Sequence, residues 1–117
     1  MVGSKIMKHE SKKITNTSQL YQFQSMLIDV LECANVECNR ILDGSASLWE
    51  LSQIQKIIIP EISELLLYAR DGKVYFKYGK KQRLLESTFF LTDSLKPLSR
   101  TNLGQGILML QKIYNQL

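Results

Sequence analysis

The sequence predicts an all-α protein: a compact four-helix bundle, with a second helix kinked at Pro60 and a short extended or β segment near residues 73–78. Apolar residues recur three or four positions apart through most of residues 17–117, which is the spacing of helices with one buried face. The stretches between them are short, as in a bundle. A chain of 117 residues is also the size of one domain. We predict a flexible N-terminal arm over residues 1–16 and a single helical-bundle domain over residues 17–117.

The first helix is predicted to begin at residue 17 and to end at Asp43-Gly44. Thr17 or Ser18 can cap its start, and glycine favours the left-handed conformation that closes a helix. Its apolar stripe consists of Leu20, Phe23, Leu27, Val30, Ala34, Cys38 and Ile41.

The second helix has a start signal at Ser47-Leu48-Trp49-Glu50, a capping box in which serine and glutamate satisfy each other's backbone N–H groups. The helical period then runs through Pro60, which has no N–H to donate to the carbonyl of Lys56. We therefore predict a kink over residues 56–60, or two short helices placed end to end. Trp49 is expected to cover the end of the bundle.

Residues 70–72 predict a turn, and residues 73–78 a short strand or an ordered loop. A lone strand needs a partner, which either a second copy of the chain or residues near 10–16 would supply. A third helix is expected from Lys80 to a stop before Pro97. Ser99 or Thr101 then caps a last helix, whose Gly104 and Gly106 allow a close approach to a neighbouring element.

Charge is distributed unevenly along the chain, whose net charge is +4. Residues 14–70 carry seven acids against three bases, whereas residues 71–83 carry five bases against Asp71. The basic residues of GKVYFKYGKKQR (72–83) lie around three aromatic ones, which favours an anion site or an acidic partner. The candidate residues for binding an anion or a partner are Lys73, Tyr75, Lys77, Tyr78, Lys80, Lys81 and Arg83.

The position of these bases strengthens the hypothesis of an anion site. In the predicted third helix, Lys80, Lys81 and Arg83 occupy the first turn, where the helix dipole disfavours positive charge and a bound anion would be stabilised. The aromatic rings would then stack on nucleic-acid bases. The alternative is that the aromatics close the end of the bundle and the lysines are merely solvated; aromatic residues more often belong to a core, which favours this alternative.

The residue inventory argues against an enzyme. The only histidine is His9, and Cys33 and Cys38 would point about 140° apart on a helix, so neither a metal site nor a disulfide is predicted. Neither a catalytic residue set nor a cofactor motif is found. No apolar run is long enough to span a membrane, and no secretion signal is present, so we expect a cytoplasmic protein.

These observations lead to two hypotheses. The first is a small non-enzymatic interaction or regulatory protein, an adaptor or immunity-type binder, that acts through its surface on a protein partner or as a homodimer. The alternative is binding of nucleic acid or a phosphate ligand through residues 72–83.

Overall fold

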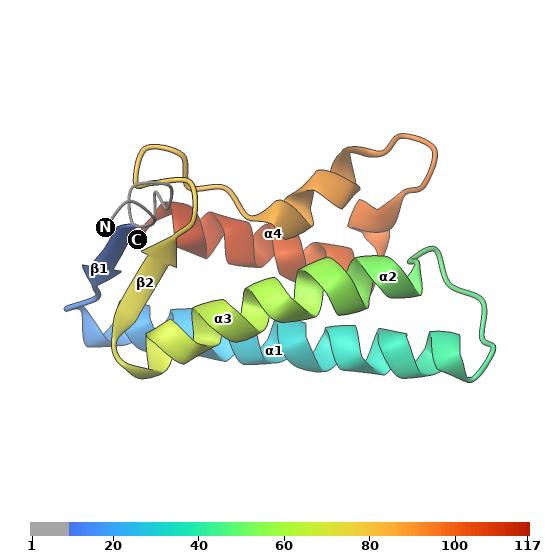
Figure 1. Cartoon of the computed structure of the whole chain (residues 1–117), viewed down its shortest axis with the longest axis horizontal. Coiled ribbons are helices and arrows are strands. Elements are labelled where there is room, and N and C mark those ends of the chain that lie inside the picture. The colour runs from blue at the N-terminus through green and yellow to red at the C-terminus, as the bar shows by residue number, and fades with distance from the viewer. Residues whose placement is uncertain (1–9) are drawn as a thin grey trace, which may run out of the picture.

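The computed structural model describes residues 10–117. In chain order the elements are β1 (Glu10–Lys13), α1 (Thr17–Leu42), α2 (Leu51–Gln53), the π-helical turn η2 (Ile54–Ile58), α3 (Ile59–Arg70), β2 (Lys73–Phe76), the 3₁₀ helices η3 (Glu86–Thr92) and η4 (Leu98–Arg100), and α4 (Asn102–Asn115). Figure 1 shows α2, η2 and α3 as one continuous helix beside α1, with α4 running back above them. The predicted helical bundle with a short β segment is confirmed.

The core lies between α1, the α2–η2–α3 helix and α4. The predicted stripe of α1 is buried at Phe23, Leu27, Val30, Ala34 and Cys38. It meets the buried Ile54, Ile58, Ile62 and Leu65, together with Leu103, Ile107, Leu110 and Tyr114 of α4. Helix α1 itself is capped by Asn16, whose side chain accepts a hydrogen bond from the Gln19 amide at 2.9 Å. The cap is therefore one residue before Thr17 and two before Ser18, the two predicted caps.

The second helix begins later than its sequence signal predicts. Glu50 is the N-cap, and its amide donates to Gln53 Oε1 at 2.8 Å, whereas the Ser47 hydroxyl accepts from the Trp49 amide at 3.0 Å and donates to Glu37. The interruption at Pro60 takes the form of the π-helical turn. The Ile59 amide donates to the carbonyl of Ile54, five residues earlier, and Pro60 falls in the first turn of α3, where its missing N–H is tolerated.

Residues 10–13, which we placed in a flexible arm, form a strand instead. Strand β1 pairs with β2 in antiparallel orientation, and Lys13 lies opposite Lys73. The expectation that residues near 10–16 supply an edge to the 73–78 segment is thus confirmed. Residues 1–9 of the predicted arm lie outside the described residues.

The third helix differs most from its prediction. Residues 77–85 form turns and irregular structure, and the helix that follows is a 3₁₀ helix starting at Glu86. Leu85 is extended because its amide donates to Gln111 Oε1 of α4 at 2.9 Å. This tertiary hydrogen bond replaces the intrahelical bond that an α-helix would make there, so a helix starting at Lys80 does not form.

The end of the bundle that lies far from the two strands is closely packed (Figure 1). Trp49 is buried, its ring is perpendicular to that of Phe90 at 6.2 Å, and its indole N–H donates to Thr101 Oγ1 at 3.0 Å. The same hydroxyl caps α4 by accepting from the Gly104 amide at 3.0 Å. A Cβ atom at Gly104 would lie 1.9 Å from the Leu98 carbonyl oxygen, so the predicted close approach is confirmed at this glycine. We call this region the Trp49 end.

Candidate functional site

Seven bases gather where the two strands and residues 77–83 meet. Pairing of β1 with β2 adds two lysines to the five bases of the 72–83 segment, because β1 lies along β2 for four residues. We call this region, at the left of Figure 1, the basic end. It comprises Lys12, Lys13, Lys73, Lys77, Lys80, Lys81 and Arg83.

The aromatic residues of the segment are distributed differently from its bases. Tyr75 is 6% exposed and stacks on Tyr68 with ring centres 5.0 Å apart. Phe76 is fully buried beside Tyr114, and the Arg83 guanidinium lies 5.1 Å from its ring centre. Tyr78 remains 39% exposed, with the Lys77 ammonium 5.7 Å from its ring centre. Tyr75 and Phe76 therefore belong to the core, and Tyr78 is the one ring of the three that reaches solvent.

The helix start predicted at residue 80 is wrong, so no helix N-terminus supports an anion site there. Arg83 instead donates to the carbonyl oxygens of Lys80 and Asn115, at 3.1 and 3.0 Å, and ties the 77–83 loop to the end of α4. The Lys80 amide donates to the Glu10 carboxylate at 3.3 Å. Arg83 thus has a structural role, and the exposed lysines around it lie on turns and strands.

Among residues 10–117, most lysines of the basic end have no acidic partner. Within residues 10–117, Lys77 is the one base of this end in an ion pair, 2.7 Å from Glu86. Lys12 donates its ammonium to the carbonyl of Leu117. The side chains of the remaining lysines, Lys13, Lys73, Lys80 and Lys81, have neither an ion pair nor a hydrogen bond in that range. These four ammonium groups are thus unpaired within the described residues.

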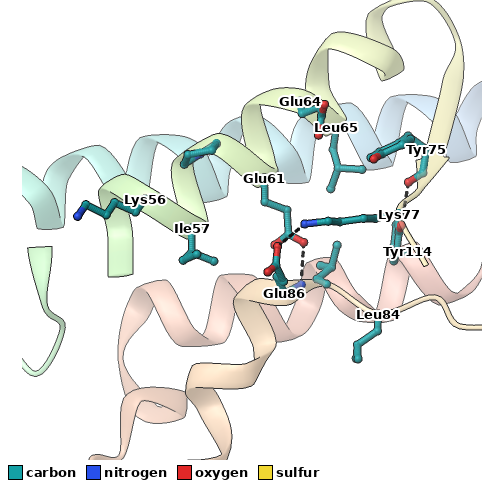
Figure 2. Close-up of a pocket in the computed structure, with 12 residues that line it drawn as sticks. Lys56, Ile57, Glu61, Glu64, Leu65, Tyr75, Lys77, Leu84, Glu86 and Tyr114 are labelled. Atoms are coloured by element: carbon teal, nitrogen blue, oxygen red, sulfur yellow. Dashed lines mark hydrogen bonds and ion pairs between the residues drawn. The ribbon is translucent and has the colours of Figure 1, made fainter. Parts of the chain in front are cut away.

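A pocket of about 310 Å³ adjoins the basic end, between α3, β2 and residues 84–86. Figure 2 shows the Lys77 side chain lying across it towards the carboxylate of Glu86. Its lining residues are Lys56, Ile57, Pro60, Glu61, Glu64, Leu65, Tyr75, Lys77, Leu84, Leu85, Glu86 and Tyr114. The lining therefore combines a mostly apolar wall with charged groups of both signs.

Glu61 is the most buried acid in this pocket, and its carboxylate is fully engaged. Oε2 accepts from the Glu86 amide at 2.7 Å, and Oε1 accepts from the amide and hydroxyl of Ser87 at 2.9 and 2.6 Å. Burial raises the pKa of Glu61, although these hydrogen bonds oppose the shift. Because its three donors are the first backbone and side-chain groups of η3, Glu61 fixes the start of that helix to α3.

The sequence-based search missed Lys12, Lys13 and Glu61. The segment Glu10–Lys13 has no apolar residue, so nothing in its pattern signals a strand, and only its pairing with β2 brings its lysines to the site. For Glu61, nothing in the sequence distinguishes this residue from an exposed helical acid. The signal for its role is a carboxylate on a helix one turn from core residues, and such a signal is common to many surface acids.

Among residues 10–117, no helix is both long enough and apolar enough to cross a membrane. In the same range, no three side chains of His, Cys, Asp or Glu are grouped as metal ligands would be. A scan against protein-family models, a search of curated proteins and a search of solved structures each found no match.

Proposed function

We propose that this chain is a small non-enzymatic interaction protein, an adaptor or immunity-type binder, and that its basic end binds an acidic surface of a partner protein. The observation that carries the proposal is the placement of Lys13 directly opposite Lys73 at an end where Lys80 and Lys81 also have no acidic partner in the described chain. Charge at this end is unbalanced within the chain, and an acidic partner would balance it.

The Lys13–Lys73 pair lowers the stability of the sheet, and this supports a binding role for the two lysines. Like charges directly opposite each other on paired strands destabilise a sheet, by up to about 1 kcal/mol. A two-stranded sheet is itself only marginally stable, so the pair lowers the stability of an already weak element. A carboxylate placed between the two ammonium groups would turn this repulsion into attraction and would steer the approach of the partner.

Binding of a nucleic acid or phosphate ligand is the second candidate. The lysines that favour an acidic protein also favour phosphate groups. Stacking on bases is less well supported, because Tyr75 and Phe76 are buried and Tyr78 alone of the three rings is exposed. Proteins that bind single strands without sequence preference combine such lysines with several stacking rings, so we rank an acidic protein surface first.

The test compares two polyanions as probes, a labelled polyglutamate peptide and a labelled single-stranded oligonucleotide, by fluorescence anisotropy. Polyglutamate is expected to bind, with an affinity that decreases from about 50 to 200 mM salt. In separate Lys73→Glu and Lys81→Glu variants, we expect that affinity to fall about tenfold or more. Tighter binding of the oligonucleotide than of polyglutamate would instead favour the phosphate candidate.

The matched control is Arg100→Glu. Arg100 is exposed in η4, at the Trp49 end, and its reversal changes the net charge by the same amount as each lysine variant. Polyglutamate should bind Arg100→Glu nearly as well as the wild type. An equal loss in all three variants would mean that total charge, and not the basic end, governs binding, and the proposal would fail.

A further inference from the structure

The register of the sheet determines which backbone groups of β1 face outwards. The Ile14 amide donates to the Gly72 carbonyl at 2.8 Å. Hydrogen-bonded pairs alternate along an antiparallel ladder, so with the register given above, Lys12 and Glu10 exchange backbone hydrogen bonds with β2. The N–H and C=O groups of Ser11 and Lys13 then point away from β2, towards the outer edge of β1.

The two outer edges of the sheet differ. On β2, the outward carbonyl of Tyr75 accepts a hydrogen bond from the Tyr114 hydroxyl at 2.8 Å, and three of the four residues are buried. On β1, all four residues are exposed. Within residues 10–117, no hydrogen bond engages the outward backbone groups of Ser11 and Lys13. The β1 edge therefore offers two donors and two acceptors in the spacing that an additional strand requires.

We propose that an extended, acidic segment of the partner pairs with the outer edge of β1 as a third strand. This inference rests on the proposed function, and it specifies both the partner segment and its mode of binding. Addition of a strand gives affinity through main-chain hydrogen bonds and selectivity through the side chains on either face. Here the outward groups of Ser11 and Lys13 supply the hydrogen bonds, and the lysines supply the selectivity.

Charges along β1 specify where the acids of the segment should lie. Lys12 and Lys13 stand on opposite faces of the sheet, since side chains alternate along a strand, and Lys13 shares its face with Lys73. The Lys12 ammonium is engaged by the carbonyl of Leu117, so carboxylates are attracted chiefly on the face of Lys13 and Lys73. Glu10, at the start of the strand, disfavours an acid beside it. The best segment is acidic on the face of Lys13 and Lys73 and neutral on the face of Lys12 and Glu10, as in a sequence that alternates acidic and apolar residues.

A second copy of the chain is a poorer occupant of the same edge. Antiparallel pairing of two β1 strands would bring the lysines at positions 12 and 13 of the two copies together. Within residues 10–117, this end already carries four lysines without an ion pair. Lysines on an edge strand are a common protection against such self-pairing. The same residues that disfavour a homodimer through this edge therefore favour an acidic segment.

The first experiment uses a blocked peptide of alternating glutamate and valine, synthesised in two versions with N-methyl groups on alternate backbone amides. Only every second amide of an added strand faces β1. One methylated version should therefore bind about tenfold more weakly than the parent peptide, and the other within about twofold of it. Equal affinities for the two methylated versions would overturn strand addition.

The second experiment removes a single outward donor. In Ser11→Pro the lost N–H is one that β1 does not donate to β2, and proline is tolerated on an edge strand in that orientation. This variant should lose peptide affinity about tenfold, whereas Ser11→Ala, which keeps the N–H, should bind as the wild type does. Slowed hydrogen exchange at the Ser11 and Lys13 amides on peptide addition provides a readout that needs no variant.

The outcomes separate this inference from the proposed function. If Ser11→Pro and both methylated peptides bind normally while Lys73→Glu still loses binding, the basic end binds acidic surfaces but not by strand addition. If neither the peptide nor polyglutamate binds the wild type at low salt, both proposals fail. A dimer that forms through β1 in the absence of peptide, detected by sedimentation, would replace the acidic segment with a second copy.

Discussion

The two ends of the bundle differ in whether their polar groups have hydrogen-bond or ion-pair partners among the described residues. At the Trp49 end, the indole N–H and the Gly104 amide both donate to the Thr101 hydroxyl, and Glu50 pairs with Lys96 at 3.0 Å. At the basic end, Lys13, Lys73, Lys80 and Lys81 have no such partners among residues 10–117. Because both ends belong to one small core, the difference cannot be ascribed to the fold class. One end contributes hydrogen bonds and an ion pair to the bundle, and the other carries the lysines that we propose bind a partner.

The largest expected effect is at the Trp49 end. The Gly104→Ala substitution places a Cβ 1.9 Å from the Leu98 carbonyl oxygen, a backbone atom, so η4 and α4 must separate. We expect the free energy of unfolding to fall by about 3 kcal/mol or more, as in severe overpacking. Urea denaturation monitored by circular dichroism measures this loss.

Gly106→Ala, two residues along the same helix, is the matched control. A Cβ there would lie 3.3 Å from Cγ2 of Val30, which is a side-chain atom, and alanine favours the helix by about 1 kcal/mol. The stability of this variant should stay within about 1 kcal/mol of the wild type. Equal losses at the two glycines would contradict the close approach at Gly104.

A smaller loss is expected for Thr101→Val. This substitution removes the hydroxyl that accepts from both the Gly104 amide and the Trp49 indole, and two buried donors lose their acceptor. The free energy of unfolding should fall by about 2 kcal/mol, measured by urea denaturation. Ser99→Ala, which removes the other candidate cap and has no such role, should change stability by less than about 0.5 kcal/mol.

The contribution of Glu61 to the free energy of unfolding is expected to depend on pH. Burial raises the pKa of Glu61 in the folded protein, so the folded state holds this proton more tightly than the unfolded chain does. The resulting contribution to stability is fully present below the ordinary carboxyl pKa and is lost as the pH rises through the folded value. Glu61→Gln has no such proton to take up.

We therefore expect Glu61→Gln to reduce the free energy of unfolding by about 1 kcal/mol at pH 7, because one of the three donors loses its acceptor. The deficit relative to the wild type should grow as the pH is lowered towards the ordinary carboxyl pKa. Urea denaturation of the two proteins at several pH values tests this. A deficit that shrinks on acidification would mean that the hydrogen bonds, and not burial, dominate the pKa of Glu61.

The smallest effect on stability, and the one of opposite sign, is expected at the basic end. Lys13→Glu replaces the repulsion with Lys73 by an attraction, so the free energy of unfolding should rise by about 0.2–1 kcal/mol. The same variant should bind polyglutamate more weakly. A thermal-shift assay and an anisotropy titration together measure both changes. Destabilisation by Lys13→Glu would show that the lysine supports the fold and would remove the contrast between the two ends.

Much of the fold could be predicted because helical periodicity records burial directly. The stripe from Phe23 to Cys38 and the run from Ile54 through Ile62 to Leu65 are buried as their spacing predicts. Helix starts were predicted less accurately. Neighbouring polar residues compete for the role of N-cap, and their side chains are chemically similar. Asn16 caps α1 in place of Thr17, and Glu50 caps α2 in place of Ser47.

The remaining differences between the predicted and the observed structure come from interactions between residues distant in sequence. The third helix begins at Glu86 because Gln111 and Glu61 take up the backbone amides of residues 85–87. Neither acceptor lies within twenty residues of that segment. Strand β1 likewise has no pattern of its own and exists through its pairing with β2. Five of the bases of the candidate site could be named from the sequence, but Lys12 and Lys13 could not, since only the folded chain brings them there.

The π-helical turn η2 has a consequence for insertions and deletions. In an α-helix the Ile59 amide would bond the carbonyl of residue 55, whereas here it bonds that of Ile54, so the turn holds one residue more than a regular helix needs. Loss of one residue within Ile54–Ile58 would convert the turn to α-helix and leave α3 in its place. The same loss in the middle of α1 would rotate half of its apolar stripe by about 100° away from the core. Chain length is therefore adjustable at η2, next to Pro60, while within α1 it is fixed by packing.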